Sequence, residues 1–182
     1  SEGLMPNLVT ADEAHRAASA ALLRQTVDVA AEQGMPYVVV HPGSYSIWGI
    51  RGGQTVVLER ATPPEQGVRL LLAEMDRLAA YGREREVTVL AENMPGRDYA
   101  WYDPIQRDPA IDVGFMSYSV LRTLGEQGVG LCLDLGHLYA ELVIGRPLDQ
   151  VWGAVMAASR ELAPCTRYLH LSTLTPPWNG TD

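Results

Sequence analysis

Four short apolar stretches of this sequence each carry, at or near the C-terminal end, a side chain that can bind a metal ion or transfer a proton. MPYVVVH and RYLHLST carry His41 and His170, EVTVLAEN carries Glu92, and GLCLDLGH carries Asp134 with His137 three residues later. Burying such groups without a partner is unfavourable. A bound dication would compensate the buried carboxylates. Neutral imidazoles combined with carboxylates are typical ligands of zinc, manganese or iron, so the pattern predicts a metal centre.

Each residue also has an ordinary structural explanation when it is taken alone. His41 precedes Pro-Gly and could be a hydrogen-bonded turn residue, and Glu92 could form an ion pair at a strand end. Asp134 could cap the helix that follows it, and His170 could be a core histidine. One shared ligand explains all four positions together, which four separate explanations do not. We expect the remaining histidine, His15, to lie exposed in the middle of a helix.

The elements that must position these side chains alternate regularly along the chain. The pattern predicts four strands, at 35–41, 86–93, 130–134 and 167–173. It predicts helices at about 10–33, 64–82, 114–126, 138–145 and 147–163, the first of them opened by a Thr10–Glu13 capping box. Loops are expected at 42–54 and 94–112. The strands are too apolar for a sheet with one wet face, which favours parallel strands covered by helices. Successive candidate ligands then lie one βα unit apart and converge on one face.

Composition narrows the class of protein further. The chain has 182 residues and a formal net charge of -8, which disfavours nucleic acid as a generic partner. All 14 positive residues are arginines, so this segment supplies no lysine for Schiff-base chemistry or a Walker-type phosphate loop. We find no signal peptide and no membrane-spanning run, and we expect a cytoplasmic location with no membrane partner. Cys132 and Cys165 are expected to be free, buried thiols.

The motifs HPGS, AEN, DLGH and YLHLS resemble the successive strand ends of the xylose isomerase-like TIM barrels, in particular the endonuclease IV family. PNLVTADEAHRAAS resembles the segment that follows the second strand of those barrels. The resemblance implies an α/β (β/α)8 TIM barrel, of which residues 1–182 form a single partial domain with roughly strands 3 to 6. It also implies that the remaining strands come from missing sequence or from another chain.

The resemblance also implies a role for each candidate ligand. His41 would bind a first metal, Glu92 would bridge two metals as the catalytic centre, and Asp134 and His170 would hold the second metal. His137 and Asp182 would belong to a third zinc. The chain departs from the endonuclease pattern at two places: MPGRDYAWYD follows the AEN motif, and Ser172 and Thr173 follow the last histidine.

Two enzymatic functions follow from this resemblance. The first is hydrolysis of a phosphodiester in abasic DNA by a metal-activated hydroxide, with up to three zinc ions. Its substrate would be bound by Arg51, Trp48, Arg97 and Trp101, on loops where arginines and aromatic residues alternate. The alternative is isomerisation or epimerisation of a small sugar or sugar phosphate.

In that alternative a single manganese or magnesium ion would be held by Glu92, Asp134 and His170, while His137 would contact the substrate. The net negative charge and the absence of lysine favour the sugar enzyme, whereas His41 and Asp182 favour the multinuclear centre. A third possibility, from a different class, is a binding domain that has kept the barrel and lost the chemistry. The presence of candidate ligands on all four strands disfavours such a non-catalytic domain.

Overall fold

The computed structural model describes residues 3–45, 47–51, 54–59, 62–94, 118–143 and 146–172 of the 182-residue chain. Within these ranges, side chains are described for 5–45, 62–94, 120–143 and 146–172. No helix among the described residues is long and apolar enough to cross a membrane.

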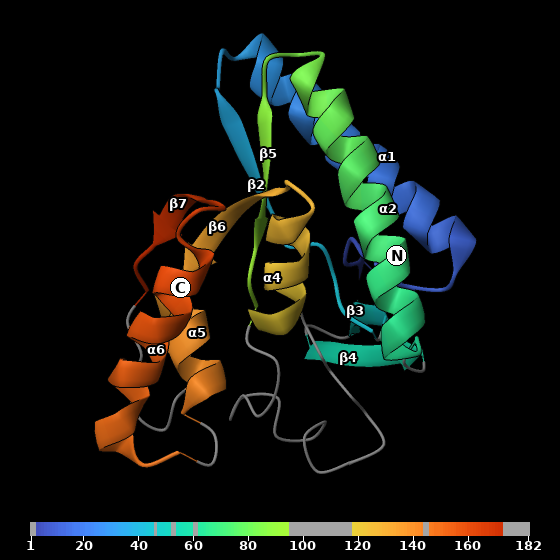
Figure 1. Cartoon of the computed structure of the whole chain (residues 1–182). Coiled ribbons are helices and arrows are strands. Elements are labelled where there is room, and N and C mark those ends of the chain that lie inside the picture. Colours follow the sequence, from blue (N-terminus) through green and yellow to red (C-terminus); the bar gives the residue numbers. More distant parts are fainter. Residues whose placement is uncertain are drawn as a thin grey trace.

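Helices and strands alternate along the chain (Figure 1). In order they are β1 (Gly3–Leu4), α1 (Glu13–Glu32), β2 (Tyr37–Val40), β3 (Ile47–Arg51), β4 (Gln54–Glu59), α2 (Pro64–Arg83), β5 (Thr88–Glu92), α4 (Tyr118–Glu126), β6 (Gly130–Asp134), α5 (Leu135–Leu142), α6 (Leu148–Leu162) and β7 (Thr166–His170). The four predicted strands and the helical segments are therefore confirmed within the described residues, with shifted ends. Residues 114–117 of the predicted helix and 95–112 of the predicted loop lie outside the described residues.

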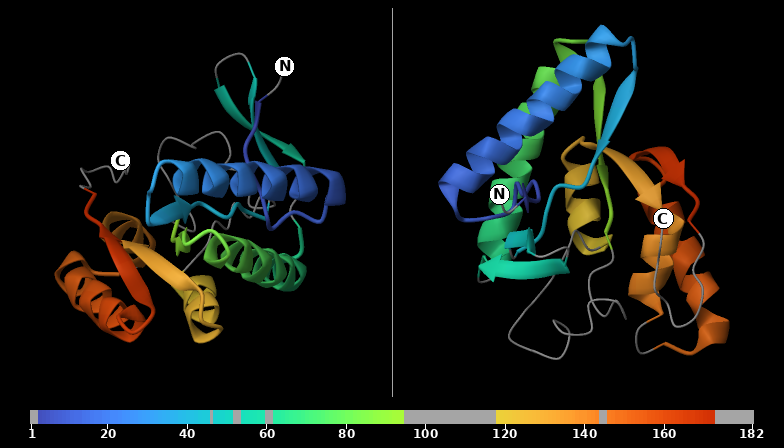
Figure 2. Two further views of the ribbon diagram at one scale, coloured as in Figure 1. Left: turned by 90° about the horizontal axis from the view of Figure 1, so that it is seen from above. Right: turned by 180° about the vertical axis from the view of Figure 1, so that it is seen from behind.

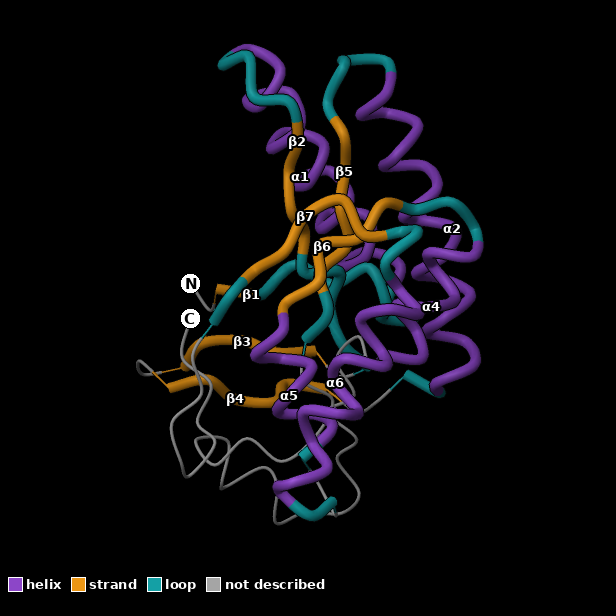
Figure 3. The backbone as a smooth tube through the Cα atoms, turned by 60° about the vertical axis from the view of Figure 1, so that its left-hand side comes forward, coloured by secondary structure: helices purple, strands orange, loops and turns teal. Residues whose placement is uncertain are grey.

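The main sheet has the order β2-β5-β6-β7, and every neighbouring pair in it is parallel. Strands that follow one another in the chain lie next to one another in the sheet, as they do in a (β/α)8 barrel. Figure 3 shows these strands side by side, apart from β1, β3 and β4. The fold is thus a partial α/β barrel covering about half of the closed structure.

The sheet is strongly curved. Tyr37 lies on β2 and Tyr168 on β7, which are the two outer strands of the sheet, yet their ring centroids are only 4.7 Å apart. Two outer strands of a flat sheet could not bring their rings together in this way, because neighbouring strands are spaced about 4.8 Å apart. The face that carries both tyrosines is therefore concave, like the inside of a barrel.

The hydrophobic core lies between the other face of the sheet and the helices. Alternate strand residues belong to this cluster, including Val38, Val40, Val89, Ala91, Leu131 and Leu133. They pack with apolar residues of α1, α2, α4 and α6, and α1 lies beside α2 (Figures 1 and 2). Since side chains alternate between the two faces of a strand, the residues between these core positions must face the concave side.

Helix α1 differs from its prediction at two positions. Its N-cap is Asp12, whose side chain accepts a hydrogen bond from the His15 amide, and Thr10 is not the cap. Thr10 instead accepts a hydrogen bond from the Asp12 amide through its hydroxyl. The prediction that His15 is exposed is wrong: the residue is 8% exposed, and its Nε2 donates to the Met5 carbonyl at 2.9 Å.

A polar cluster joins α1 to the end of α2. The Tyr81 hydroxyl lies 2.9 Å from both carboxylate oxygens of Asp28, and Arg85 donates to the same carboxylate while lying over the Tyr81 ring. The hydrogen bonds from Arg85 and Tyr81 hold the pKa of Asp28 below its ordinary value. The cluster fixes the α1–α2 pair that supports β2 and β5.

The glycine-rich segment 42–54 after β2 was predicted as a loop, and this prediction is wrong for 47–51 and for Gln54. Residues 47–51 and 54–59 form the antiparallel strands β3 and β4, and β1 pairs with β3 to complete a small second sheet. In Figure 1 the hairpin lies near the carboxyl ends of β2 and β5. It therefore stands at the end of the barrel that carries the predicted site.

Candidate metal centre

The strand register places the predicted ligands on the concave face. Asp134 pairs with His170, and Glu92 pairs with Cys132, which lies two residues before Asp134 on the same face of β6. Val40 pairs with Ala91, so His41, the next residue along, follows β2 beside Glu92. All these positions lie at the carboxyl ends of the parallel strands, as the sequence predicted.

Glu92 is the centre of the group. Its side chain is buried, and each of its carboxylate oxygens faces a different histidine. His41 Nε2 lies 3.2 Å from Oε2, and His170 Nδ1 lies 2.9 Å from Oε1. His137 Nδ1 lies 3.8 Å from the same Oε1. The structure thus brings three of the predicted histidines around one carboxylate.

Burial and hydrogen bonding act on Glu92 in opposite directions. Burial disfavours the charged carboxylate and raises its pKa, whereas the hydrogen bonds from His41 and His170 lower it. The histidines prevail, and the pKa of Glu92 lies below its ordinary value. The side chain is therefore an anion at neutral pH.

His137 is held in one orientation by the backbone of β5. Its Nδ1 lies 2.9 Å from the Asn93 carbonyl oxygen, and a carbonyl can only accept a hydrogen bond, so Nδ1 carries the proton. When the ring is neutral, its lone pair is then on Nε2. Its own backbone amide donates to Asp134 Oδ1 at 2.7 Å, which makes Asp134 the N-cap of α5. The helix-cap explanation for Asp134 is therefore correct, and it coexists with a place in the cluster.

Asn93 connects the ends of β5 and β6. Its side-chain oxygen accepts from the Asp134 amide at 2.7 Å, and its side-chain nitrogen donates to the Asp134 carbonyl at 3.0 Å. These two bonds join β5 to β6 in the way that a pair of backbone hydrogen bonds would, just beyond the last paired residues of the two strands. Because Asn93 is 1% exposed, this link is shielded from water. It fixes the position of Asp134 relative to Glu92.

Ser172 follows β7 and reaches back to the same corner. Its hydroxyl donates to Asp134 Oδ1 at 2.8 Å. It packs against Gly136, where an added Cβ would overlap the Ser172 hydroxyl. The sequence singled out Ser172 only as a departure from the endonuclease pattern, and the structure assigns it this contact with a predicted ligand.

The donor set fits a divalent cation. The ligand atoms of Glu92, Asp134 and His137 all lie within 4.8 Å of one another, as do those of Glu92, Cys132 and His170. Two ligand atoms that each lie about 2.1 Å from one ion are about 3 to 3.5 Å apart. The observed separations of 2.9 Å from Glu92 to His170 and 3.2 Å from Glu92 to His41 are close to this range.

Cys132 lies beneath this cluster, and sequence reasoning did not include it. It is fully buried, and burial together with the nearby carboxylates of Glu92 and Asp134 raises its pKa to about 12. In the absence of a cation the thiol is therefore protonated at neutral pH. Both cysteines are free, as predicted; Cys165 is only partly buried.

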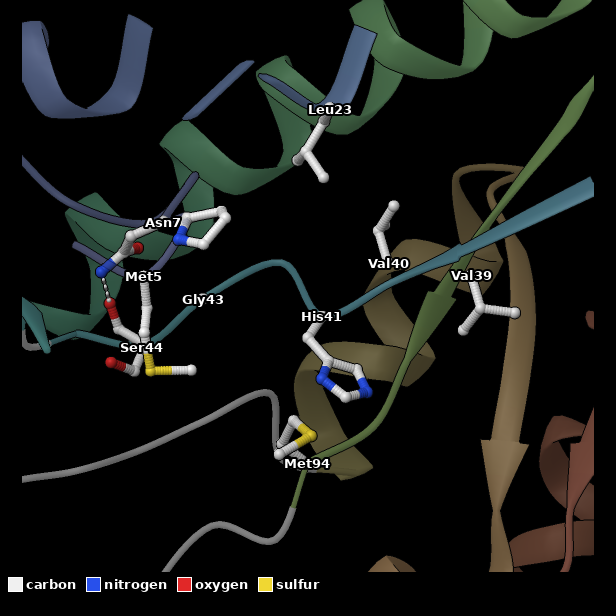
Figure 4. A pocket seen from close by; sticks show the side chains of 10 residues that line it. Met5, Asn7, Leu23, Val39, Val40, His41, Gly43, Ser44 and Met94 are labelled. Atoms are coloured by element: carbon white, nitrogen blue, oxygen red, sulfur yellow. Dashed lines mark hydrogen bonds between the residues drawn. The ribbon is translucent and has the colours of Figure 1, made fainter. Parts of the chain in front are cut away.

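A cavity of about 280 Å³ lies beside His41 (Figure 4). Its lining is largely apolar, including Met5, Val39 and Met94. Asn7 closes one side and donates from its side chain to the Ser44 carbonyl at 2.9 Å. The cavity therefore places a small apolar space next to a polar cluster.

The remaining predicted site residues cannot be placed. Arg97, Trp101 and Asp182 lie outside the described residues. Trp48 and Arg51 belong to β3, but the structure describes only their backbone. The suggested third zinc and the suggested substrate contacts therefore stay predictions.

The sequence profile of the family described as "Xylose isomerase-like TIM barrel" matches residues 2–177. The chain belongs to this family. Among solved structures, a xylose isomerase domain protein from Planctomyces limnophilus matches with a TM-score of 0.54 and 18% identity, over 92% of this chain and 46% of that one. No curated protein matches the sequence.

Two further solved structures carry titles that state an activity. D-psicose 3-epimerase from Clostridium cellulolyticum H10 matches with a TM-score of 0.56 and 15% identity, over 91% of this chain and 48% of that chain. L-ribulose 3-epimerase matches with a TM-score of 0.58 and 16% identity, over 91% and 46%. This xylose isomerase-like chain thus spans about half the length of these relatives, and at such identities the likeness establishes the fold alone.

Proposed function

We propose that this chain carries the metal-binding face of an enzyme that isomerises or epimerises a small sugar. The observation that carries the proposal is the arrangement around Glu92: a buried, anionic carboxylate with histidines at both oxygens, at the carboxyl ends of parallel barrel strands. The similarity to a D-psicose 3-epimerase and an L-ribulose 3-epimerase supports a sugar as the substrate class.

In this proposal Glu92, Asp134 and His170 hold one divalent cation, manganese or magnesium. When bound there, the cation would polarise neighbouring oxygens of the sugar. Glu92 enters the site already ionised, because its histidine neighbours keep its pKa low. Asn93 holds Asp134 beside it through two buried hydrogen bonds. The protein thus holds two of the three proposed ligands, Glu92 and Asp134, next to each other.

His137 is assigned to the substrate in this proposal. The hydrogen bond from its Nδ1 to the Asn93 carbonyl leaves Nε2 as the basic nitrogen of the neutral ring. This hydrogen bond also fixes the orientation of the ring, so the direction in which Nε2 points is set by the end of β5. Asp134 contributes by anchoring the first turn of α5, which carries His137.

Hydrolysis of a phosphodiester is the second candidate, and one observation favours it. The two oxygens of Glu92 face different histidines, His41 on one side and His170 on the other. A carboxylate that bridges two metals is placed in the same way, with one oxygen toward each ion. In that case His41 would be a ligand of the first metal, and the ions would be zinc.

Metal content and two activity assays separate these candidates. The purified protein is analysed for bound metals and then assayed with a panel of ketoses and with an abasic-site DNA duplex, each with and without a chelator. The sugar proposal predicts about one manganese or magnesium per chain and chelator-sensitive conversion of at least one ketose. Close to three zinc ions with cleavage of abasic DNA would contradict it and favour the second candidate.

The proposed enzyme also needs the rest of its barrel. Within the described sheet, β2 and β7 each pair with only one neighbouring strand. An open parallel edge tends to pair with further strands. We propose that strands from elsewhere in the same protein or from another chain pair with these two edges. Light scattering of the active species, compared with the mass of its polypeptide, distinguishes the two sources.

A further inference from the structure

The two oxygens of the Asp134 carboxylate have different surroundings. Oδ1 accepts hydrogen bonds from the His137 amide at 2.7 Å and from the Ser172 hydroxyl at 2.8 Å. No group among the described residues donates to Oδ2. Asp134 itself is 1% exposed, so protein contacts dominate its environment. One oxygen is thus occupied by two donors, whereas none of the described residues donates to the other.

The contact from Ser172 depends on a glycine across the corner. A Cβ at Gly136 would overlap the Ser172 hydroxyl and would lie 3.1 Å from both the Cβ and the carbonyl oxygen of Ser172. A side chain at 136 would therefore push Ser172 away from Asp134. The glycine at the start of α5 makes room for the hydroxyl that engages Oδ1.

We propose that Ser172 is a positioning residue that makes Asp134 bind its cation through Oδ2 alone. A free carboxylate can rotate and bring both oxygens to an ion. Here rotation would break two hydrogen bonds at Oδ1, one of which also caps α5. Asp134 therefore acts as a one-oxygen ligand with a fixed direction. This inference rests on the proposed metal centre, but it does not depend on the identity of the substrate.

The test compares Co²⁺ binding by the full chain with binding by a Ser172→Ala variant. Affinity is measured by competition with a chelator, and coordination by the visible absorption of the bound ion. Loss of a group that orients a metal ligand typically weakens binding by about 10- to 100-fold. We expect about a tenfold loss, and weaker visible bands, since a carboxylate that binds through both oxygens raises the coordination number.

Ser159→Ala is the matched control. The Ser159 hydroxyl donates to the Val155 carbonyl at 2.8 Å within α6, outside the metal cluster. Its removal deletes a serine hydroxyl and one hydrogen bond without touching a predicted ligand. The control should bind Co²⁺ with the affinity and spectrum of the unchanged protein.

Gly136→Ala tests the same contact from the other side of the corner. It should weaken Co²⁺ binding as Ser172→Ala does, and its effect should shrink when both changes are combined, because the displaced hydroxyl is then already absent. A correctly folded Ser172→Ala variant with unchanged affinity and spectrum overturns the inference alone. If the unchanged protein binds no Co²⁺, the proposed function falls, and this inference falls with it.

Discussion

Replacing Glu92 by Gln removes the negative charge from the centre of the cluster while keeping its shape. The carboxylate faces His41 and His170, and its pKa lies below the ordinary value, so the change deletes an anion at neutral pH. The change should lower the affinity for metal far more than it lowers the stability of the metal-free protein. We expect the affinity for Mn²⁺ to fall at least 100-fold, which corresponds to about 2.7 kcal/mol. Activity should be lost.

The stability of the metal-free protein should change by only about 1–2 kcal/mol. Hydrogen bonds to a charged group contribute about 1.5–3 kcal/mol each. However, the side chains of His41 and His170 are 49% and 41% exposed, which screens these contacts. Removing the charge also removes the cost of burying it. These opposing effects leave a small net loss.

Thermal unfolding with and without Mn²⁺ measures both effects. A ligand present at 100 times its Kd stabilises a protein by about 2.7 kcal/mol, which raises the Tm of a domain of this size by roughly 5–10 °C. The Glu92→Gln variant should lose most of this shift at the same Mn²⁺ concentration. Glu74→Gln is the control, because Glu74 is mostly buried and contacts Arg16 and Arg77 on the helices. Unchanged Mn²⁺ binding by Glu92→Gln would refute the reasoning.

Three further predictions concern the fold. Without metal, a thiol reagent at pH 8 should label Cys165 in the native protein and Cys132 only after unfolding, since Cys132 is buried with a pKa of about 12; rapid native labelling of Cys132 would contradict its burial. Gly82→Ala should destabilise by about 1–3 kcal/mol in denaturant titrations, because its Cβ would meet the backbone before β5, whereas Gly153→Ala in open space should stabilise by up to about 1 kcal/mol. The lowered pKa of Asp28 contributes stability that is present above its unfolded pKa of about 3.9 and is lost as the pH falls through its folded pKa. Asp28→Asn should therefore reduce the decrease of the unfolding free energy at acid pH. An unchanged dependence of the unfolding free energy on pH would contradict this contribution.

The positions of the candidate ligands could be predicted because the end of a buried strand shows in the sequence as a change from apolar to polar residues. Runs of apolar residues ended at His41, Glu92, Asp134 and His170, and parallel strands bring such ends to one edge of a sheet. In the structure His41 and His170 lie against the Glu92 carboxylate, and Asp134 lies near the same carboxylate. Their roles as metal ligands remain predictions that the experiments above test.

Other features had a local signal that the sequence analysis overlooked. In the sequence, Gly52 and Gly53 stand between the stretches that form β3 and β4, and such a pair is typical of two-residue hairpin turns between β-branched or aromatic residues. His15 begins the buried stripe of α1 that continues through Ser19, Leu23 and Val27. The helical spacing of this stripe already indicated that the histidine faces inward.

The links around Asp134 had no signal that a single sequence could provide. The bonds from Asn93 depend on the register of β5 against β6, and the contact of Ser172 depends on where the chain passes after β7. Both are decided by tertiary packing rather than by local propensity. Positioning residues of this kind can therefore be recognised only once the strands are assembled.

The most direct test of the account is a crystal structure with Mn²⁺, in which anomalous scattering locates the ion. We predict a peak about 2.0–2.3 Å from an oxygen of Glu92, with Asp134 Oδ2 and a nitrogen of His170 at similar distances. A peak away from these residues, or no peak in crystals of an active preparation, would contradict the central claim that the strand ends form a metal centre.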